Sequence, residues 1–132
     1  MKYEVLIIDD EDLILTIVKK LVIKSKIHPS PLLFTTVNEA LEYNQVEKTQ
    51  DLSSLILLDI HLPDFNAWDF LTALENLYPH SPIYVVMITS SINLSDRKKA
   101  EKFRHVIGYL EKPLMLADME SIKQLEPLSK FF

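Results

Sequence analysis

Five short apolar segments recur along the chain, and each is followed by a longer stretch with apolar residues every three or four positions. The short segments are rich in Val, Ile, Leu and Tyr and alternate only weakly, which is typical of strands covered on both faces. They are Tyr3–Ile8, Leu32–Thr35, Leu55–Leu58, Ile83–Ile88 and Val106–Leu110. The pattern therefore predicts five strands of a buried, parallel sheet.

The longer stretches predict amphipathic helices. The first is indicated by apolar residues at helical spacing between Ile14 and Val22, and the sequence His-Pro-Ser-Pro that follows breaks it. Three further helices are expected at Val37–Val46, Trp68–Leu77 and Asp96–Phe103, and a last one starts near Asp118. Within the third helix, Trp68, Leu71, Leu74 and Leu77 share one face, and we expect Trp68, Leu71 and Leu74 to be core rather than binding surface. Pro127 is expected to end or kink the last helix.

Strand and helix alternate along the whole sequence. Such alternation predicts a doubly wound α/β fold, with a parallel sheet, helices on both faces and right-handed crossovers. A chain of 132 residues fits one domain. We expect this domain to span residues 1–132 and to leave no room for an output domain.

Composition narrows the possible functions. The chain has no cysteine, so disulfides and thiolate metal sites are excluded, and Gly108 is its only glycine, so it has no glycine-rich phosphate loop. The net charge of −5 argues against direct binding of nucleic acid. No apolar run reaches the roughly 18 residues of a membrane span. A cytoplasmic protein without membrane attachment is the expectation.

Chemistry-bearing residues follow four of the five expected strands. Ligands of doubly wound sheets bind beyond the carboxyl ends of the strands, so these side chains are expected to converge at one edge. They are Asp9 and Asp10 after the first strand, Asp59 after the third, Thr89 and Ser90 after the fourth, and Lys112 after the fifth.

Each of these residues also has a simpler interpretation. Asp10 could cap the first helix, Asp59 could open a turn, Thr89 could be a loop hydroxyl and Lys112 an exposed charge. These interpretations do not explain why all of them follow strands. Together the residues predict a site for a divalent cation and a phosphoryl group, because clustered carboxylates bind Mg²⁺ and a carboxylate can act as nucleophile.

Four segments carry a resemblance to a known family. "LIIDDE", "LILLDIHLP", "VVMITSS" and "YLEKP" occur in the order and at the spacing found in the receiver domain of two-component response regulators. The sequence resembles this family over nearly its whole length. The resemblance implies a flavodoxin-like receiver fold with a five-stranded parallel sheet in the order 2-1-3-4-5.

The resemblance also implies a role for individual residues. Asp59 would be the phosphoacceptor, Asp10 would bind Mg²⁺ directly, and Asp9 would bind it through water or assist. The backbone carbonyl of His61 would complete the protein ligands, and Lys112 would contact the phosphoryl group.

Two further residues would transmit the signal. Thr89 would contact the phosphoryl group, and Tyr109 aligns with the aromatic residue that turns inward when Thr89 moves. The bond between Lys112 and Pro113 would be cis. Departures from the family pattern occur at Asn66-Ala67, at Ser90 and at His105-Val106, and the last of these removes the glycine-type stop of the fourth helix, beside the switch surface.

The function implied is a stand-alone phosphorylation switch. It would accept a phosphoryl group from a histidine kinase or histidine phosphotransfer protein, and would catalyse at most its own phosphorylation and dephosphorylation. Output would pass to an unknown downstream protein, and a dimer could form through the face of the fourth helix, fifth strand and fifth helix. The alternative is a phosphorylation-independent interaction scaffold.

The remaining candidates carry less weight. The four histidines lack paired metal spacing and are expected at the surface or in loops. A basic run from Arg97 to Arg104 in the fourth helix could be a solvated face or meet an acidic partner. A phosphatase of the haloacid dehalogenase type would need a second Asp two residues after Asp59, where this chain has His61.

Overall fold

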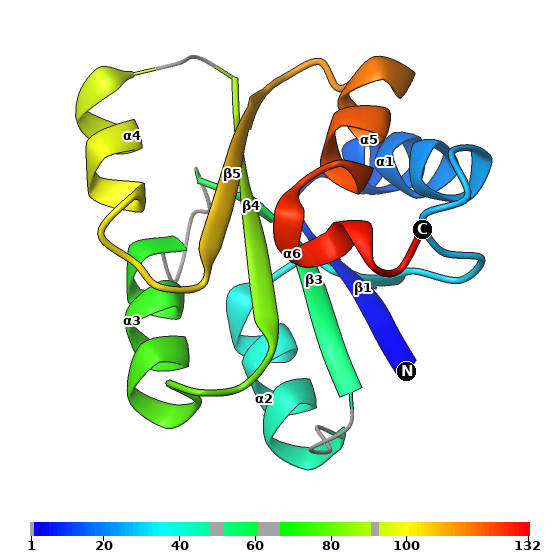
Figure 1. Cartoon of the computed structure of the whole chain (residues 1–132). Coiled ribbons are helices and arrows are strands. Elements are labelled where there is room, and N and C mark those ends of the chain that lie inside the picture. Colours follow the sequence, from blue (N-terminus) through cyan, green and yellow to red (C-terminus); the bar gives the residue numbers. More distant parts are fainter. Residues whose placement is uncertain (1, 48–51, 61–66, 91–92) are drawn as a thin grey trace.

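The computed structural model describes residues 2–47, 52–60, 67–90 and 93–132. A five-stranded parallel sheet forms its centre, with strand order β2-β1-β3-β4-β5, so the predicted order is confirmed. The strands are β1 (Lys2–Ile8), β2 (Leu32–Phe34), β3 (Leu52–Asp59), β4 (Ile83–Thr89) and β5 (Val106–Glu111). Figure 1 shows β3, β4 and β5 crossing the middle of the molecule.

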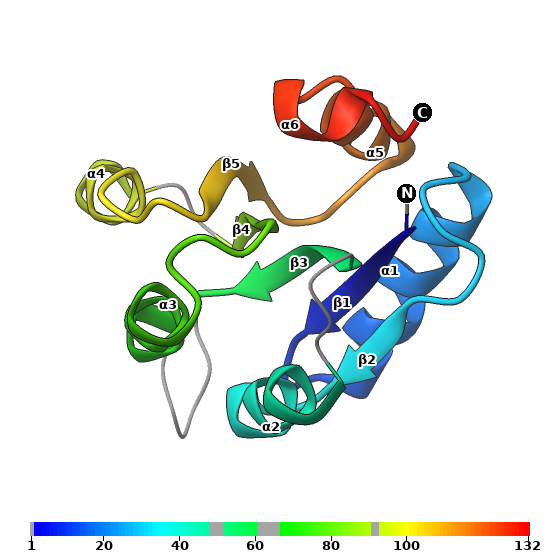
Figure 2. The ribbon, with the colours of Figure 1, turned by 60° about the horizontal axis from the view of Figure 1, so that its bottom comes forward.

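Helices cover both faces of the sheet, as predicted. One face carries α2 (Val37–Glu47), α3 (Ala67–Leu77) and α4 (Leu94–Ala100), and the other carries α1 (Asp12–Lys24), α5 (Leu116–Lys123) and α6 (Glu126–Ser129). Figure 2 looks along the layers and separates these two groups of helices. No helix among the described residues is both long and apolar enough to cross a bilayer.

Alternation along the strands divides the core into two halves. Leu6 and Ile8 of β1 face α2 and α3, where Phe70 is fully buried, whereas Val5 and Ile7 face α1 and α5. Burial of each such side chain contributes about 1.5–3 kcal/mol. The polar residues that follow the strands are therefore held on a rigid frame.

The ends of two helices differ from the prediction. The last predicted helix is divided: α5 ends at Lys123, and Pro127 lies in the first turn of a separate helix, α6. Proline is tolerated there because the first N–H groups of a helix have no intrahelical partner. The predicted helix from Asp96 to Phe103 instead starts at Leu94, because the Asn93 side chain accepts hydrogen bonds from the backbone N–H groups of Ser95 and Asp96.

Two residues show that burial depends on tertiary packing. Leu77 shares a face of α3 with Trp68, Leu71 and Leu74 but is 51% exposed, because it lies in the last turn, beyond the core packing. His105 lies in the turn before β5, in agreement with its expected place in a loop, but it is buried there, and its Nδ1–H donates to the Ile83 carbonyl. Of the other histidines, His28 is half-buried, His80 is exposed and His61 lies outside the described residues.

Trp68 connects two helices. It packs on the core beneath α3, stacks on Phe103 with ring centroids 6.2 Å apart, and has the Lys99 ammonium of α4 4.6 Å from its ring centre. Packing on the core agrees with the prediction, and the contact with Lys99 adds a cation–π interaction. The indole therefore lies where a shift of α4 changes its surroundings.

Candidate functional site

The carboxyl ends of β1 and β3 bring two aspartates together. Ile8 pairs with Leu58, so Asp9 and Asp59, one residue further along, emerge side by side. Asp9 and Asp59 are buried and Asp10 is exposed, and each of the three offers an oxygen within 4.8 Å of the others. The predicted convergence of carboxylates is confirmed.

Asp9 connects two distant segments of the chain. Its Oδ1 accepts the Glu11 backbone N–H at 3.0 Å, and its Oδ2 accepts a hydrogen bond from the Lys112 ammonium at 2.8 Å. The residue at the N-cap of α1 is Glu11, so the simpler interpretation of Asp10 as the helix cap is wrong. The side chain of Asp10 therefore does not cap α1.

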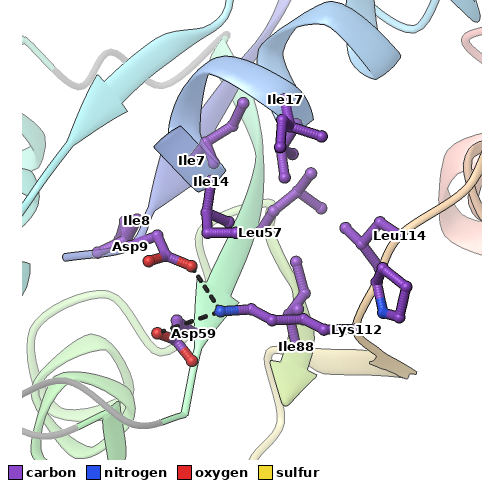
Figure 3. Close-up of a pocket in the computed structure, with 12 residues that line it drawn as sticks. Ile7, Ile8, Asp9, Ile14, Ile17, Leu57, Asp59, Ile88, Lys112 and Leu114 are labelled. Atoms are coloured by element: carbon purple, nitrogen blue, oxygen red, sulfur yellow. Dashed lines mark hydrogen bonds and ion pairs between the residues drawn. The ribbon is translucent and has the colours of Figure 1, made fainter. Parts of the chain in front are cut away.

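Lys112 supplies the positive charge of the site. Its Nζ lies 2.8 Å from Asp9 Oδ2 and 3.6 Å from Asp59 Oδ2. Figure 3 shows the ammonium extending toward both carboxylates. Burial alone would lower the pKa of Lys112, but the hydrogen bond to Asp9 and the charges of Asp59, Asp9 and Glu11 outweigh burial and raise this pKa. The peptide bond from Lys112 to Pro113 is cis, as the resemblance implied.

The carboxylates fit a hard divalent cation. Mg²⁺ takes oxygen ligands and is commonly held by one or two carboxylates together with water and phosphate oxygens. Asp10, exposed and not engaged as a helix cap, is the carboxylate best placed to give a direct ligand, whereas both oxygens of Asp9 already accept hydrogen bonds. The predicted contribution of His61, and the altered turn at Asn66, lie outside the described residues.

Thr89 and Tyr109 lie on the other face of the sheet from the pair of buried acids. Thr89 ends β4 and is fully buried, on the side that α4 covers, and Ser90 beyond it is exposed. Tyr109 packs on the same half of the core, and its hydroxyl is buried near Thr89 and the Asn93 backbone without a hydrogen bond of good geometry to described residues. Burial, followed by the charge of Asp96, raises the pKa of this hydroxyl.

Comparison with known proteins decides the family. The sequence profile of the response regulator receiver domain matches residues 5–124. The chain belongs to the response regulator receiver domain family. It is therefore a receiver of the two-component type, and phosphorylation-based signalling is its general role.

Solved structures of other receivers agree with this assignment. A two-component response regulator from Cytophaga hutchinsonii is 25% identical with a TM-score of 0.80, and the match covers 98% of this chain and 99% of that one. A response regulator receiver protein from Dyadobacter fermentans is 28% identical with a TM-score of 0.80, over 95% and 98% of the two chains. A CheY-like receiver from Methanospirillum hungatei is 25% identical with a TM-score of 0.75, over 100% and 99%. No curated protein gives a significant match.

Sequence reasoning missed the apolar surroundings of the receiver's site. A pocket of about 310 Å³ reaches from Asp9, Asp59 and Lys112 into the space beneath α1. Ile14 and Ile17 of α1 line it, together with residues of the strands. The signal was present in the helical pattern of Ile14 and Ile17, but the pattern alone does not tell a pocket wall from a packed core.

The exposed acid of the receiver gives a test of the metal site. Asp10→Asn keeps the shape of the side chain and removes one of three neighbouring negative charges, so the free energy of unfolding without metal should rise by on the order of 1 kcal/mol. Mg²⁺ should stabilise the variant much less than the wild type, because a direct ligand is lost. Thermal melts of both proteins, with and without Mg²⁺, check this. Equal melting temperatures in all four samples would contradict a metal site at Asp10.

Proposed function

We propose that this receiver accepts a phosphoryl group on Asp59 from a phosphohistidine, and that Mg²⁺ is required. The donor would be a histidine kinase or a histidine phosphotransfer protein, and the phosphorylated receiver would act as a signalling switch in the cytoplasm. The observation that carries the proposal is the position of Asp59, a buried carboxylate whose Oδ2 lies 3.6 Å from the Lys112 ammonium and beside two other acids.

The chemical step follows from this geometry. An oxygen of Asp59 attacks the phosphorus, the P–N bond of the phosphohistidine breaks, and its electron pair returns to the imidazole nitrogen. The leaving imidazole, which carries a proton on its other nitrogen, departs neutral, so no further proton is needed. Mg²⁺, when bound to Asp10 and its neighbours, would neutralise charge on the phosphoryl oxygens.

Lys112 has a second role in this scheme. Its ammonium lies 3.6 Å from Asp59 Oδ2 and has three N–H donors, so it can donate to a phosphoryl oxygen attached to Asp59. Because its pKa is raised, Lys112 is charged at neutral pH. From the other face of the sheet, the Thr89 hydroxyl would donate a further hydrogen bond to the phosphoryl group. Tyr109 would then turn inward as Thr89 moves.

Exposed apolar side chains beside the site support docking of a protein donor. Leu13 on α1 is 69% exposed and Met115 before α5 is 61% exposed, and Ile17 and Leu116 are also exposed. Apolar groups gathered around a polar site are typical of protein interfaces. For the downstream protein or a second copy, the corresponding surface would be α4, β5 and α5, where Leu94 is exposed and β5 is the last strand of the sheet.

Mass spectrometry tests the proposal directly. After incubation with a small phosphodonor such as acetyl phosphate and Mg²⁺, the wild-type receiver should gain one phosphoryl group that hydroxylamine removes. The same incubation with EDTA should leave the mass unchanged. A receiver that stays unmodified with Mg²⁺, yet still captures a partner, would instead be the phosphorylation-independent scaffold. If the protein is a switch, the only phosphate that it releases should come from hydrolysis of its own aspartyl-phosphate.

The proposed readout also has a test. Beryllofluoride with Mg²⁺ imitates the phosphoryl group, and it should change the fluorescence of Trp68, since the Lys99 ammonium of α4 lies 4.6 Å from this ring. Thr89→Ala should still bind beryllofluoride but lose most of the fluorescence change, because the hydroxyl that moves is gone. Ser90→Ala is the matched control and should respond as the wild type does. Amide shifts confined to the loops beside Asp9, Asp59 and Lys112 would contradict the switch.

A further inference from the structure

A pocket that phosphoryl transfer does not use extends from the proposed site under α1. It has a volume of about 310 Å³ and lies between α1, the ends of three strands, and the segment from Lys112 to Leu114. Figure 3 shows its walls, with Ile14 and Ile17 on one side, Leu57 behind them and Leu114 opposite. The proposed phosphoryl chemistry uses the carboxylates, the ammonium, Mg²⁺ and the Thr89 hydroxyl, so the apolar part of the pocket has no role in it.

The size of the pocket suits a small ligand. A cavity of about 150 Å³ lined by apolar side chains holds one benzene molecule. The present pocket has about twice that volume, which matches two fused rings, and it lies at the lower end of the range for ligand sites, about 300–1,000 Å³. Its apolar walls are formed by Ile7, Val18 and Ile88 in addition to Ile14, Ile17, Leu57 and Leu114. Such walls bind flat hydrocarbon surfaces and offer them no hydrogen bonds.

The opposite end of the pocket is polar and its charges do not balance. Asp9 and Asp59 line it with one positive group, Lys112, and Asp10 adds a third carboxylate within 4.8 Å of the other two. The ammonium of Lys112 is already bonded to Asp9, so an anionic ligand would meet the carboxylates with little compensation. A cationic group at this end would instead be attracted by the excess negative charge.

The pocket can be reached from solvent. Ile17 on its rim is 44% exposed, and Pro113 on the facing segment is exposed as well. A ligand could therefore enter between α1 and this segment without unfolding either. The apolar interior and the charged end then fix its orientation, with the hydrocarbon part beneath α1 and the cation at Asp9 and Asp59.

We propose that this pocket binds a small amphiphilic cation, with a flat apolar body of about two fused rings and an ammonium group. The ammonium pairs with the carboxylates of Asp9 and Asp59 and so competes with Mg²⁺ for the same charge. If Asp59 is the phosphoacceptor, which rests on the proposed function, such a ligand antagonises phosphorylation. Binding itself does not depend on that function.

The test uses three probes with one body and different charges: 1-naphthylmethylamine, 1-naphthalenemethanol and 1-naphthoic acid. Each is titrated into the metal-free receiver while methyl signals of isoleucine are followed by NMR. The amine should shift Ile7, Ile14, Ile17 and Ile88, which line the pocket, and should leave Ile56 and Ile83 on the other face of the sheet unchanged. The amine should bind more tightly than the alcohol, and the acid most weakly.

Matched variants separate the pocket from the surface around it. Ile14→Phe and Ile17→Phe fill the space and should each weaken binding of the amine by about tenfold or more, equivalent to at least about 1.4 kcal/mol. Leu13→Phe is the control, because Leu13 lies on the same helix, is 69% exposed and does not line the pocket. Saturating Mg²⁺ should weaken binding of the amine and leave binding of the alcohol nearly unchanged.

Three results would overturn the proposal. They are shifts confined to exposed methyl groups, equal binding of amine and acid, or filling variants that bind as well as Leu13→Phe does. Failure here is distinct from failure of the proposed function. If the receiver is phosphorylated but does not bind the amine, only the proposal of a ligand pocket is refuted. If it binds the amine but is never phosphorylated, only the proposed switch function is refuted.

Discussion

Asp59→Asn should abolish phosphorylation of the receiver completely. The amide oxygen is a far weaker nucleophile than the carboxylate. Among the described acids, Asp9 is also buried beside the Lys112 ammonium, but its two oxygens already accept hydrogen bonds from Glu11 and Lys112, so we do not expect it to replace Asp59. Incubation with acetyl phosphate and Mg²⁺, followed by intact mass spectrometry, measures the phosphorylated fraction. We expect it to be undetectable in the variant under conditions that modify most of the wild type.

The matched control is Asp12→Asn. Asp12 is exposed in the first turn of α1, and its replacement by Asn changes the net charge as Asp59→Asn does. The Asp12→Asn variant should therefore be phosphorylated as the wild type is. Circular dichroism should show both variants folded. Phosphorylation of Asp59→Asn to the wild-type extent would mean that a different side chain is the nucleophile.

Lys112→Met should destabilise the metal-free receiver by about 2 kcal/mol, since it leaves two buried carboxylates beside one another without a cation. The figure is below that for a fully buried pair because the Lys112 side chain is 19% exposed. Mg²⁺ should recover much of the loss, because it supplies positive charge to the same carboxylates. Urea unfolding with and without Mg²⁺ measures both effects.

Lys98→Met serves as the control for loss of a lysine. Lys98 is exposed on α4, away from the carboxylates, and its replacement should change the free energy of unfolding by less than about 0.5 kcal/mol. If Lys112→Met and Lys98→Met unfold at the same urea concentration without metal, the ion pairs at the site contribute nothing to stability.

The difference in stability between the wild type and Lys112→Met should depend on pH. The pKa of Lys112 in the folded protein is raised above its ordinary value of 10.5, so folding favours the charged form. Its contribution is fully present below pH 10.5 and disappears as the pH rises through the folded-state pKa. The gap between wild type and Lys112→Met should therefore stay constant near neutral pH and close only in alkaline solution.

The strands were predictable from sequence for a physical reason, whereas their order followed from the resemblance to the receiver family. Strands covered on both faces need continuous apolar residues, and Val5–Ile8 and Leu55–Leu58 supply them at the centre of the sheet. The residues that follow such strands must then leave the core at one edge. Asp9, Asp59 and Lys112 were predictable as neighbours on that basis, before any resemblance was considered.

Contacts between distant side chains were not predictable. Glu4 looked like an ordinary polar residue of β1, but it is buried and accepts hydrogen bonds from Tyr43 and Ser54, which belong to other elements. His105 is buried for a related reason, because the Ile83 carbonyl offers its ring an acceptor. The local sequence around a residue does not show which side chain tens of residues away it will contact.

Details of the site had a similar limit. Four consecutive acids do not reveal which one caps the helix, and the structure assigns the backbone contact at this turn to Asp9 and leaves Asp10 exposed. Pro127 is expected to end or kink the last helix, but α5 already ends at Lys123, and the proline lies in the first turn of the next helix. In both cases the sequence indicates a helix end nearby, and its exact position depends on packing.

The bond between Asp9 and Lys112 has a consequence for the kinetics of folding. It joins residues 103 positions apart, and the strands from β2 to β5 all lie between them. Contacts that close so long a loop form late, after the local structure inside it. An interaction absent from the transition state leaves the folding rate nearly unchanged and slows unfolding. The charges that prepare this receiver for chemistry therefore also prolong the lifetime of its native state.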